Sequence, residues 1–351
     1  GGSGQAGALF LQNKNGSFTR KNQAAFEADK ASDDADALFF DANGDGSPDL
    51  YVCSGGYANF MPDDAALQDR LYLNDGKGNF SKSANALPKM LVSKSCVRAA
   101  DVNGDGKPDL FVGGRVIPGR YPEIPRSYLL INDGKGQFKD QTSSLASTLS
   151  QVGMVSDAAW YDLNGDKRPE LILVGEFMPI SVFGQKNGKW TDVSSTYFDK
   201  KYAGMWNRLL LEDLNGDGKA DLVLGNLGQN SQLQASDKEP VELFFKDFDD
   251  NGAVDPILCY FNQGTSYPYV TRDELLDQMS IMRPRFPDYK SYADATLKEV
   301  FTAEELKGVT RLEANYLKTV LFVMGTNNKF QEKALPLEAQ AAPVFAICTL
   351  D

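Results

Sequence analysis

One ten-residue pattern of acidic residues and glycine recurs along the chain and constrains the fold more than any other feature. It reads Asp-Ala-Asn-Gly-Asp-Gly-Ser-Pro-Asp-Leu over residues 41–50 and Asp-Val-Asn-Gly-Asp-Gly-Lys-Pro-Asp-Leu over residues 101–110. Three further copies begin at Asp162, Asp213 and Asp247, the last with an altered middle. The starts are 60, 61, 51 and 34 residues apart. Self-similarity at such spacing is typical of a repeat architecture. We call these segments the five acidic loops and number their positions from the first Asp.

Short apolar runs flank each acidic loop, as residues 37–40 and 50–53 do around the first. Runs of this length, bounded by Gly and Asp, indicate buried strands, so each acidic loop is expected to be the turn of a hairpin. A second hairpin signal, built on Asn-Gly or Asp-Gly, follows the first three loops. Its copies span residues 71–80, 129–138 and 182–190, with related segments at 9–18 and 321–330.

Two hairpins per unit predict a four-stranded antiparallel sheet, and tandem units of this kind favour an all-β protein, a β-propeller. We expect a single propeller domain over residues 1–351, with about six to seven blades and incomplete terminal ones. Asp351 resembles the first residue of a sixth acidic loop. A two-sheet sandwich with acidic turns is the alternative, although it does not require the same turn in every unit.

Residues 271–315 break the repeat and predict a helical insertion in the last blade. Thr271 with Glu274, and Thr302 with Glu305, have the spacing of capping boxes, which begin helices. Pro284 and Pro287 fall between the two and would separate the helices. A packing cap is the expected role of this insertion.

Oxygen donors occupy alternate positions of each acidic loop, which suits a hard cation that takes six to eight oxygens, namely calcium. Positions 1, 3, 5 and 9 carry Asp, Asn or Glu, and the variable position 7 would contribute its backbone carbonyl. The predicted ligands are Asp41, Asn43, Asp45, Ser47, Asp49; Asp101, Asn103, Asp105, Lys107, Asp109; Asp162, Asn164, Asp166, Arg168, Glu170; Asp213, Asn215, Asp217, Lys219, Asp221; and Asp247, Asp249, Asn251, Ala253, Asp255.

EF-hands are excluded because they need a bidentate Glu at position 12 and flanking helices. Position 12 is instead Val52, Val112, Leu173, Leu224 or Leu258. The remaining alternative is a set of metal-free turns. Three acids per loop repel one another and require a counter-charge. Five Ca²⁺ ions would add ten positive charges and leave a formal charge of −2 in place of −12. Exposed calcium loops are typically weak, which favours an extracellular, cell-surface or periplasmic location.

The loop sequences resemble FG-GAP/VCBS repeats, the units of integrin-α-like β-propellers. The segments 113–118, 223–228 and 335–345 are similar to parts of large bacterial surface proteins that carry the ASPIC/UnbV module. This resemblance covers nearly the whole chain. It implies a calcium-binding propeller fold and says little about the ligand.

Composition excludes several classes of function. The chain has no histidine, which removes Ser-His-Asp and Cys-His catalysis and histidine metal sites. Its 48 acids against 36 bases make nucleic acid an unexpected partner. No apolar run is long enough to span a bilayer. Four widely spaced cysteines match no zinc or redox motif, and buried free thiols are favoured over one or two disulfides.

Long connections between the second and third strands of a blade are the expected ligand-binding face, because binding residues concentrate on loops of a rigid scaffold. The candidates are Tyr57, Arg115, Arg120, Tyr121 and Asn226. We expect a non-catalytic calcium-binding propeller for extracellular recognition or adhesion, with a glycan or protein ligand, as a monomer or part of a longer chain. The alternative is a carbohydrate-active enzyme, a polysaccharide lyase or glycosidase, although the obvious carboxylates are assigned to metal.

Overall fold

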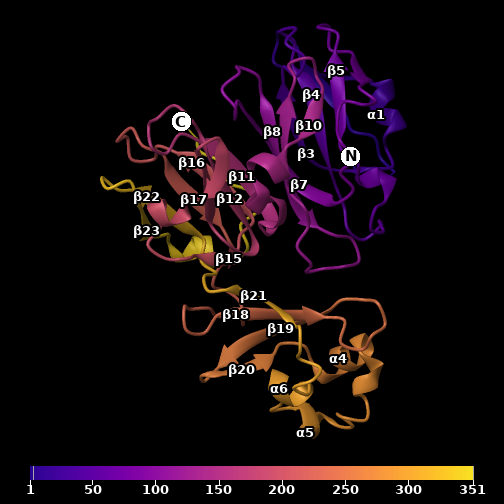
Figure 1. Ribbon diagram of the computed structural model, residues 1–351, viewed down its shortest axis with the longest axis vertical. Coiled ribbons are helices and arrows are strands. Elements are labelled where there is room, and N and C mark those ends of the chain that lie inside the picture. The colour runs from indigo at the N-terminus through magenta and orange to yellow at the C-terminus, as the bar shows by residue number, and fades with distance from the viewer. Residues whose placement is uncertain (3, 351) are drawn as a thin grey trace. The chain divides into compact units, whose positions relative to one another are not determined.

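The computed structural model describes residues 1–2 and 4–350, so Asp351, the predicted start of a sixth acidic loop, lies outside the described residues. The fold is all-β, with mostly antiparallel sheets and few helices (Figure 1). The sequence predicts one domain over residues 1–351. The chain divides into two compact units. The first unit consists of Gly1–Gly119, Glu123–Leu173 and Ser181–Val193. The second unit consists of Arg120–Pro122, Val174–Ile180 and Ser194–Asp351.

The first unit contains three consecutive antiparallel sheets in which each strand pairs with the next along the chain. The first sheet is β3 (Asp33–Phe40), β4 (Asp49–Gly55), β5 (Arg70–Asn74) and β6 (Phe80–Lys82). The second is β7 (Ser93–Ala100), β8 (Asp109–Val116), β9 (Tyr128–Asn132) and β10 (Phe138–Asp140). The third is β11 (Met154–Tyr161), β12 (Glu170–Pro179), β13 (Ser181–Lys186) and β14 (Lys189–Asp192), and β12 continues past Leu173 into the second unit.

Shorter elements accompany these sheets. They are the hairpin β1 (Leu9–Gln12) and β2 (Phe18–Lys21), the helices α1 (Ala24–Ala28) and α2 (Thr142–Leu145), and the 3₁₀ turns η1 (Ala65–Leu67) and η2 (Ser147–Gln151).

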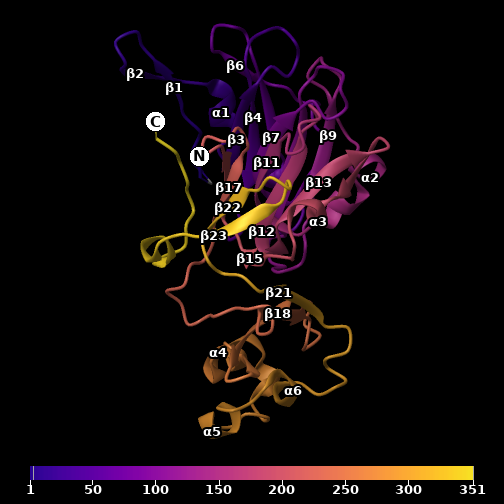
Figure 2. The same cartoon turned by 90° about the vertical axis from the view of Figure 1, so that its left-hand side faces the viewer.

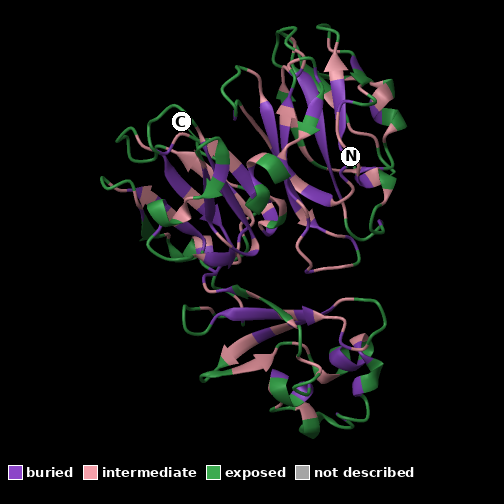
Figure 3. Ribbon diagram, viewed as in Figure 1, coloured by how far each residue is buried: buried purple, intermediate pink, exposed green. Residues whose placement is uncertain are grey.

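The first strands of the three sheets lie side by side. Strand β7 contacts both β3 and β11. Arg98 on β7 forms ion pairs with Asp36 on β3, at 2.6 Å, and with Asp157 on β11. Between the first two sheets, Tyr51 and Leu71 belong to the same buried cluster as Leu110. The sheet centres are buried and the loops are exposed (Figure 3).

The second unit contains a fourth sheet whose two hairpins are far apart in the sequence. It is formed by β16 (Arg208–Glu212), β17 (Asp221–Gly225), β22 (Val320–Met324) and β23 (Phe330–Ala334). Strands β17 and β22 pair directly, with Leu222 opposite Phe322. The second hairpin predicted at 321–330 therefore completes the fourth sheet. Shorter elements of this unit are α3 (Ser194–Tyr197), β15 (Ala203–Met205), which pairs with β12, and η4 (Leu337–Gln340).

A separate sheet with helices is inserted between β17 and β22. Its strands in spatial order are β20 (Thr265–Pro268), β19 (Asp255–Asn262), β18 (Val241–Lys246) and β21 (Thr310–Ala314). Its helical elements are α4 (Arg272–Gln278), η3 (Ser280–Met282), α5 (Tyr289–Tyr292) and α6 (Leu297–Val300), which lie together beside this sheet in both views (Figures 1 and 2).

The predicted insertion at 271–315 therefore holds three α-helices and ends in a strand. The Thr271–Glu274 capping box is present at the start of α4. Thr302 and Glu305 make reciprocal hydrogen bonds of the same kind, but the segment after them forms turns. Strand β21 falls inside the predicted range because it pairs with β18, a contact that capping signals cannot reveal.

All four cysteines are unpaired, as the sequence favoured. Cys53, Cys96 and Cys259 are buried as expected, whereas Cys348 is exposed. Among the described residues no helix has the length and apolar character needed to cross a membrane.

Candidate metal centres

Each acidic loop folds around the carboxylate at position 1. In the first loop, Asp41 Oδ1 accepts hydrogen bonds from the backbone N–H groups of Gly44 and Asp45, at 2.8 and 3.2 Å. Its Oδ2 accepts from Gly46 N–H at 2.8 Å. The same three bonds recur around Asp101, Asp162 and Asp213, and two of them recur around Asp247. One local conformation is therefore repeated in all five loops.

Positions 3, 5 and 7 continue this pattern. Asn43 Oδ1 accepts from Asp45 N–H at 2.9 Å, and Asp45 Oδ1 accepts from Ser47 N–H at 2.7 Å. Lys107, Arg168, Lys219 and Ala253 likewise donate their backbone N–H to the position 5 side chain. The repeat thus directs side-chain oxygens of alternate residues toward the inside of the loop.

Position 6 requires a left-handed backbone, which glycine adopts without strain. Gly46, Gly106 and Gly218 have φ angles of 83°, 80° and 83°. Lys167 replaces glycine in the third loop and still has φ of 68°, with its N–H bonded to Asp162 at 2.8 Å. The third loop therefore keeps its conformation despite a residue that disfavours it.

Position 9 is buried and joins the acidic loop to a neighbouring segment. Asp109 accepts from Val102 N–H at 3.2 Å and, across the sheet, from Asn132 N–H at 2.8 Å. Asp49 and Asp221 make the equivalent cross-sheet bonds to Asn74 and Met324. Burial raises the pKa of Asp109 to about 6, and it raises those of Asp49, Glu170 and Asp255 as well. This structural role of position 9 was missed by the sequence reasoning.

The fifth loop brings three carboxylates together. One oxygen each from Asp247, Asp249 and Asp255 lies within 4.8 Å of the other two. Asp249 Oδ1 is buried and has no hydrogen-bond partner among the described residues. The other four loops carry Asn at position 3, and in two of them its amide donates to position 9, from Asn164 to Glu170 at 2.6 Å and from Asn215 to Asp221 at 3.2 Å.

The side chain at position 7 has a contact that the sequence reasoning also missed. Lys107 Nζ donates to Asp133 O at 2.9 Å, and Lys219 Nζ donates to Gly325 O at 3.0 Å. Both acceptors lie in the turn of the second hairpin of the same sheet. Lys occurs at position 7 of two loops, and each of them faces a second-hairpin turn, Asn132-Asp133-Gly134 for Lys107 and residues 325–328 for Lys219.

The five residues predicted to contact a glycan or protein ligand differ in how exposed their side chains are. Tyr57 is 47% exposed, and Arg115 and Arg120 are half-buried. Tyr121 donates its hydroxyl to Glu176 at 2.5 Å. Asn226 is fully buried, and its side chain bonds Met205 N–H at 3.1 Å and the carbonyl of Tyr316 at 3.0 Å. In this structure the Asn226 amide is a buried group that joins neighbouring segments of the scaffold, and its predicted ligand-binding role stays a prediction.

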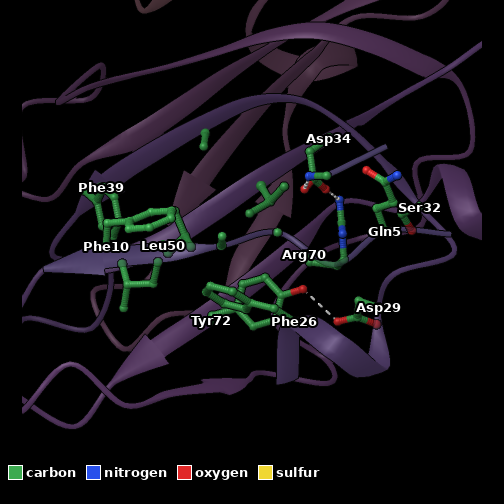
Figure 4. A pocket seen from close by; sticks show the side chains of 16 residues that line it. Gln5, Phe10, Phe26, Asp29, Ser32, Asp34, Phe39, Leu50, Arg70 and Tyr72 are labelled. Atoms are coloured by element: carbon green, nitrogen blue, oxygen red, sulfur yellow. Dashed lines mark hydrogen bonds and ion pairs between the residues drawn. The ribbon is translucent and has the colours of Figure 1, made fainter. Parts of the chain in front are cut away.

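A pocket of about 390 Å³ lies on the face of the first sheet that points away from the second sheet. Phe10, Phe26 and Phe39 line it together with Arg70 and Tyr72 (Figure 4). Arg70 Nη2 donates to Asp34 at 2.6 Å, and the Tyr72 hydroxyl donates to Asp29 at 2.7 Å. Burial, with the bond to Asp29, holds the pKa of Tyr72 well above its usual value.

Comparison with known proteins matches two segments, residues 59–112 and 162–224, to the FG-GAP-like repeat. A comparison with curated proteins finds no match. The first segment contains the second acidic loop, and the second segment contains the third and fourth. The chain therefore carries FG-GAP-like repeats, and three of its five acidic loops lie within them.

Proposed function

We propose that this chain is a calcium-stabilised β-propeller that recognises a glycan or protein ligand outside the cell or in the periplasm, without catalysing a reaction. The observation that carries the proposal is the fifth acidic loop, where three carboxylates converge and the buried Asp249 Oδ1 lacks a partner. Like charges at this separation repel strongly unless a cation neutralises them.

The donor set fits calcium. Each loop offers carboxylate and amide oxygens at positions 1, 3, 5 and 9, with a backbone carbonyl at position 7, and no nitrogen or sulfur donor. Asp247, Asp249, Asn251, Ala253 and Asp255 would hold the ion in the fifth loop. Bound calcium would attract all the carboxylates of a loop and so offset their mutual repulsion. It would also stabilise the conformation of the hairpin turn. Weak loop sites of this kind fill where calcium is millimolar.

The propeller arrangement is supported by the order of the sheets. In the first unit the first strands of the three sheets, β3, β7 and β11, lie next to one another, and the apolar face of the first sheet packs on the second. Successive four-stranded sheets related in this way are the building pattern of propeller blades. Six to seven blades remain our proposal for the complete ring.

Calcium removal tests the metal assignment. Chelator is expected to lower the melting temperature by many degrees, because a ligand held by the native state alone stabilises it by about 2.7 kcal/mol per site at 100 times its Kd. Isothermal titration with CaCl₂ should then show Asp249→Ala losing one bound calcium ion. Asp75→Ala, which removes an exposed acid from a second hairpin turn, serves as the matched control and should bind as the wild type does. A melting temperature that chelator does not change would contradict calcium binding.

Recognition itself is tested by a screen of glycans and proteins with and without calcium. The pocket lined by Arg70 and Tyr72 does not support the enzymatic alternative, a lyase or glycosidase. A catalytic tyrosine base must lose its proton, whereas the pKa of Tyr72 is raised and its hydroxyl already donates to Asp29. Turnover of a glycan in the screen would overturn the non-catalytic part of the proposal.

A further inference from the structure

A second pocket, of about 380 Å³, lies on the inserted sheet between the β19–β20 hairpin and the turn that joins α5 to α6. Its volume falls within the range of about 300–1,000 Å³ that is typical of small-molecule sites. Its lining includes Tyr260, Asn262, Gln263, Tyr267, Tyr292 and Asp294. None of them belongs to an acidic loop or to the ligand face predicted from the sequence.

The hairpin presents aromatic rings and amides on one face. Tyr260 pairs directly with Tyr267 across the strands, and Asn262 follows Tyr260 by two residues, so the three side chains share a face. The neighbouring residue Cys259 points to the opposite face, where it packs in the core formed with α4 and α6. One face of the hairpin therefore packs in the core of the insertion, and the other lines the pocket, with the Tyr260 ring held edge-on by Tyr269.

The walls of this pocket are held in place before any ligand binds. The Tyr292 hydroxyl donates to the carbonyl of Val270 at 2.9 Å, and its ring packs edge-on against Phe286 at 5.2 Å. Gln263 has φ of 52° and is followed by Gly264 at 81°, the conformation of a tight two-residue hairpin turn. A preorganised pocket loses less entropy on binding.

The polar groups of the pocket are available for a ligand. Within the part of the chain that the structure describes, the hydroxyls of Tyr260 and Tyr267, the side-chain amides of Asn262 and Gln263, and the Asp294 carboxylate form no hydrogen bond or ion pair with other side chains or with the backbone. Together they offer both donors and acceptors.

We propose that this pocket binds one sugar residue of a neutral glycan. A pyranose ring has an apolar C–H face that packs on tyrosine rings, and its hydroxyl groups donate to and accept from amides and a carboxylate. The charged side chain on the wall is Asp294, which disfavours uronic or sulfated sugars by repulsion. A purely apolar ligand would leave the amides and the carboxylate without partners. This inference rests on the proposed recognition function and assigns its ligand class and its location.

The test uses the intact chain on an array of neutral and acidic glycans, followed by calorimetric titration of the strongest neutral oligosaccharide. Tyr267→Ala and Asn262→Ala are each expected to raise the Kd at least tenfold. Tyr267→Phe, which keeps the ring, should have a smaller effect. Tyr289→Ala, which removes an exposed tyrosine of the same insertion that does not line the pocket, is the matched control and should leave the Kd unchanged. Thermal melts establish that each variant is folded.

The outcomes separate this inference from the proposed function. Glycan binding that survives Tyr267→Ala and Asn262→Ala but is lost in Tyr57→Ala overturns the pocket and leaves the recognition function standing. Binding to proteins alone does the same. Binding of acidic glycans only overturns the neutral sugar. Binding of tetramethylammonium without binding of any neutral oligosaccharide overturns it as well, since tyrosines beside a carboxylate would then be a cation site. Binding of no ligand of any kind overturns both.

Discussion

The carboxylate at position 9 has two functions within one acidic loop, a structural one and a proposed metal-binding one. Asp109 accepts backbone N–H bonds from its own loop and from the next hairpin while it is fully buried. Buried N–H groups that lose their acceptor each cost about 1–3 kcal/mol. The residue therefore matters to stability with or without a metal ion.

Asp109→Ala should lower the free energy of unfolding by about 2–4 kcal/mol, because Val102 N–H and Asn132 N–H both lose their acceptor. The loss should persist in chelator. Asp105→Ala, at the exposed position 5, loses one hydrogen bond from Lys107 N–H and should destabilise the protein far less in chelator than in calcium. Urea denaturation followed by circular dichroism measures both. A loss in Asp109→Ala that vanishes in chelator would mean that position 9 acts through the metal alone.

Elements whose signals are local could be predicted from the sequence, and those that depend on distant pairing could not. The acidic loops and the Asn-Gly turns form where expected because their side chains bond backbone groups only a few residues away. The pairing of β17 with β22 is different. Its cause is the packing of Leu222 and Phe322, which no spacing rule connects across residues 226–319. The pocket at Tyr260 and Tyr267 was missed for the same reason, since it needs the turn after α5.

An ion pair between Arg285 and Glu305 joins two turns of the inserted segment, and its strength depends on pH. Arg285 binds both oxygens of Glu305 at 3.0 Å, and this bond lowers the Glu305 pKa from 4.5 to about 2. A depressed carboxylate pKa stabilises the folded state above the unfolded value, and that stability is lost as the pH falls from about 4.5 toward 2.

The insertion should therefore lose stability between pH 4.5 and pH 2 in the wild type more steeply than in Glu305→Gln, which removes this titration. The variant should be the less stable of the two at pH 7. Thermal melts across this range, in chelator to remove any metal contribution, measure the difference. Glu304→Gln, the exposed neighbour, is the matched control and should follow the wild-type profile. Parallel profiles for wild type and Glu305→Gln would contradict the assignment.

At the scale of the whole molecule, the chain consists of two compact units, each with its own buried cluster, and strand β12 passes from the first unit into the second. Three acidic loops lie in the first unit and two in the second. Proteins divided in this way commonly unfold in more than one step.

Differential scanning calorimetry should accordingly show two transitions. Asp249→Ala should shift only the transition of the second unit in calcium, because that residue lies in the fifth loop. Asp101→Ala, at position 1 of the second loop, is the complementary variant and should shift the other transition. A single transition that both variants move equally would show that the two units unfold together.

The fourth sheet has one further consequence. Strand β17 ends at Gly225 and its direct neighbour β22 begins at Val320, so the chain leaves and re-enters the scaffold at adjacent points. An inserted segment that starts and ends on neighbouring strands can change in length or be replaced without altering the register of the sheet that carries it. The inserted segment can thus diverge in sequence while the sheet that carries it stays the same.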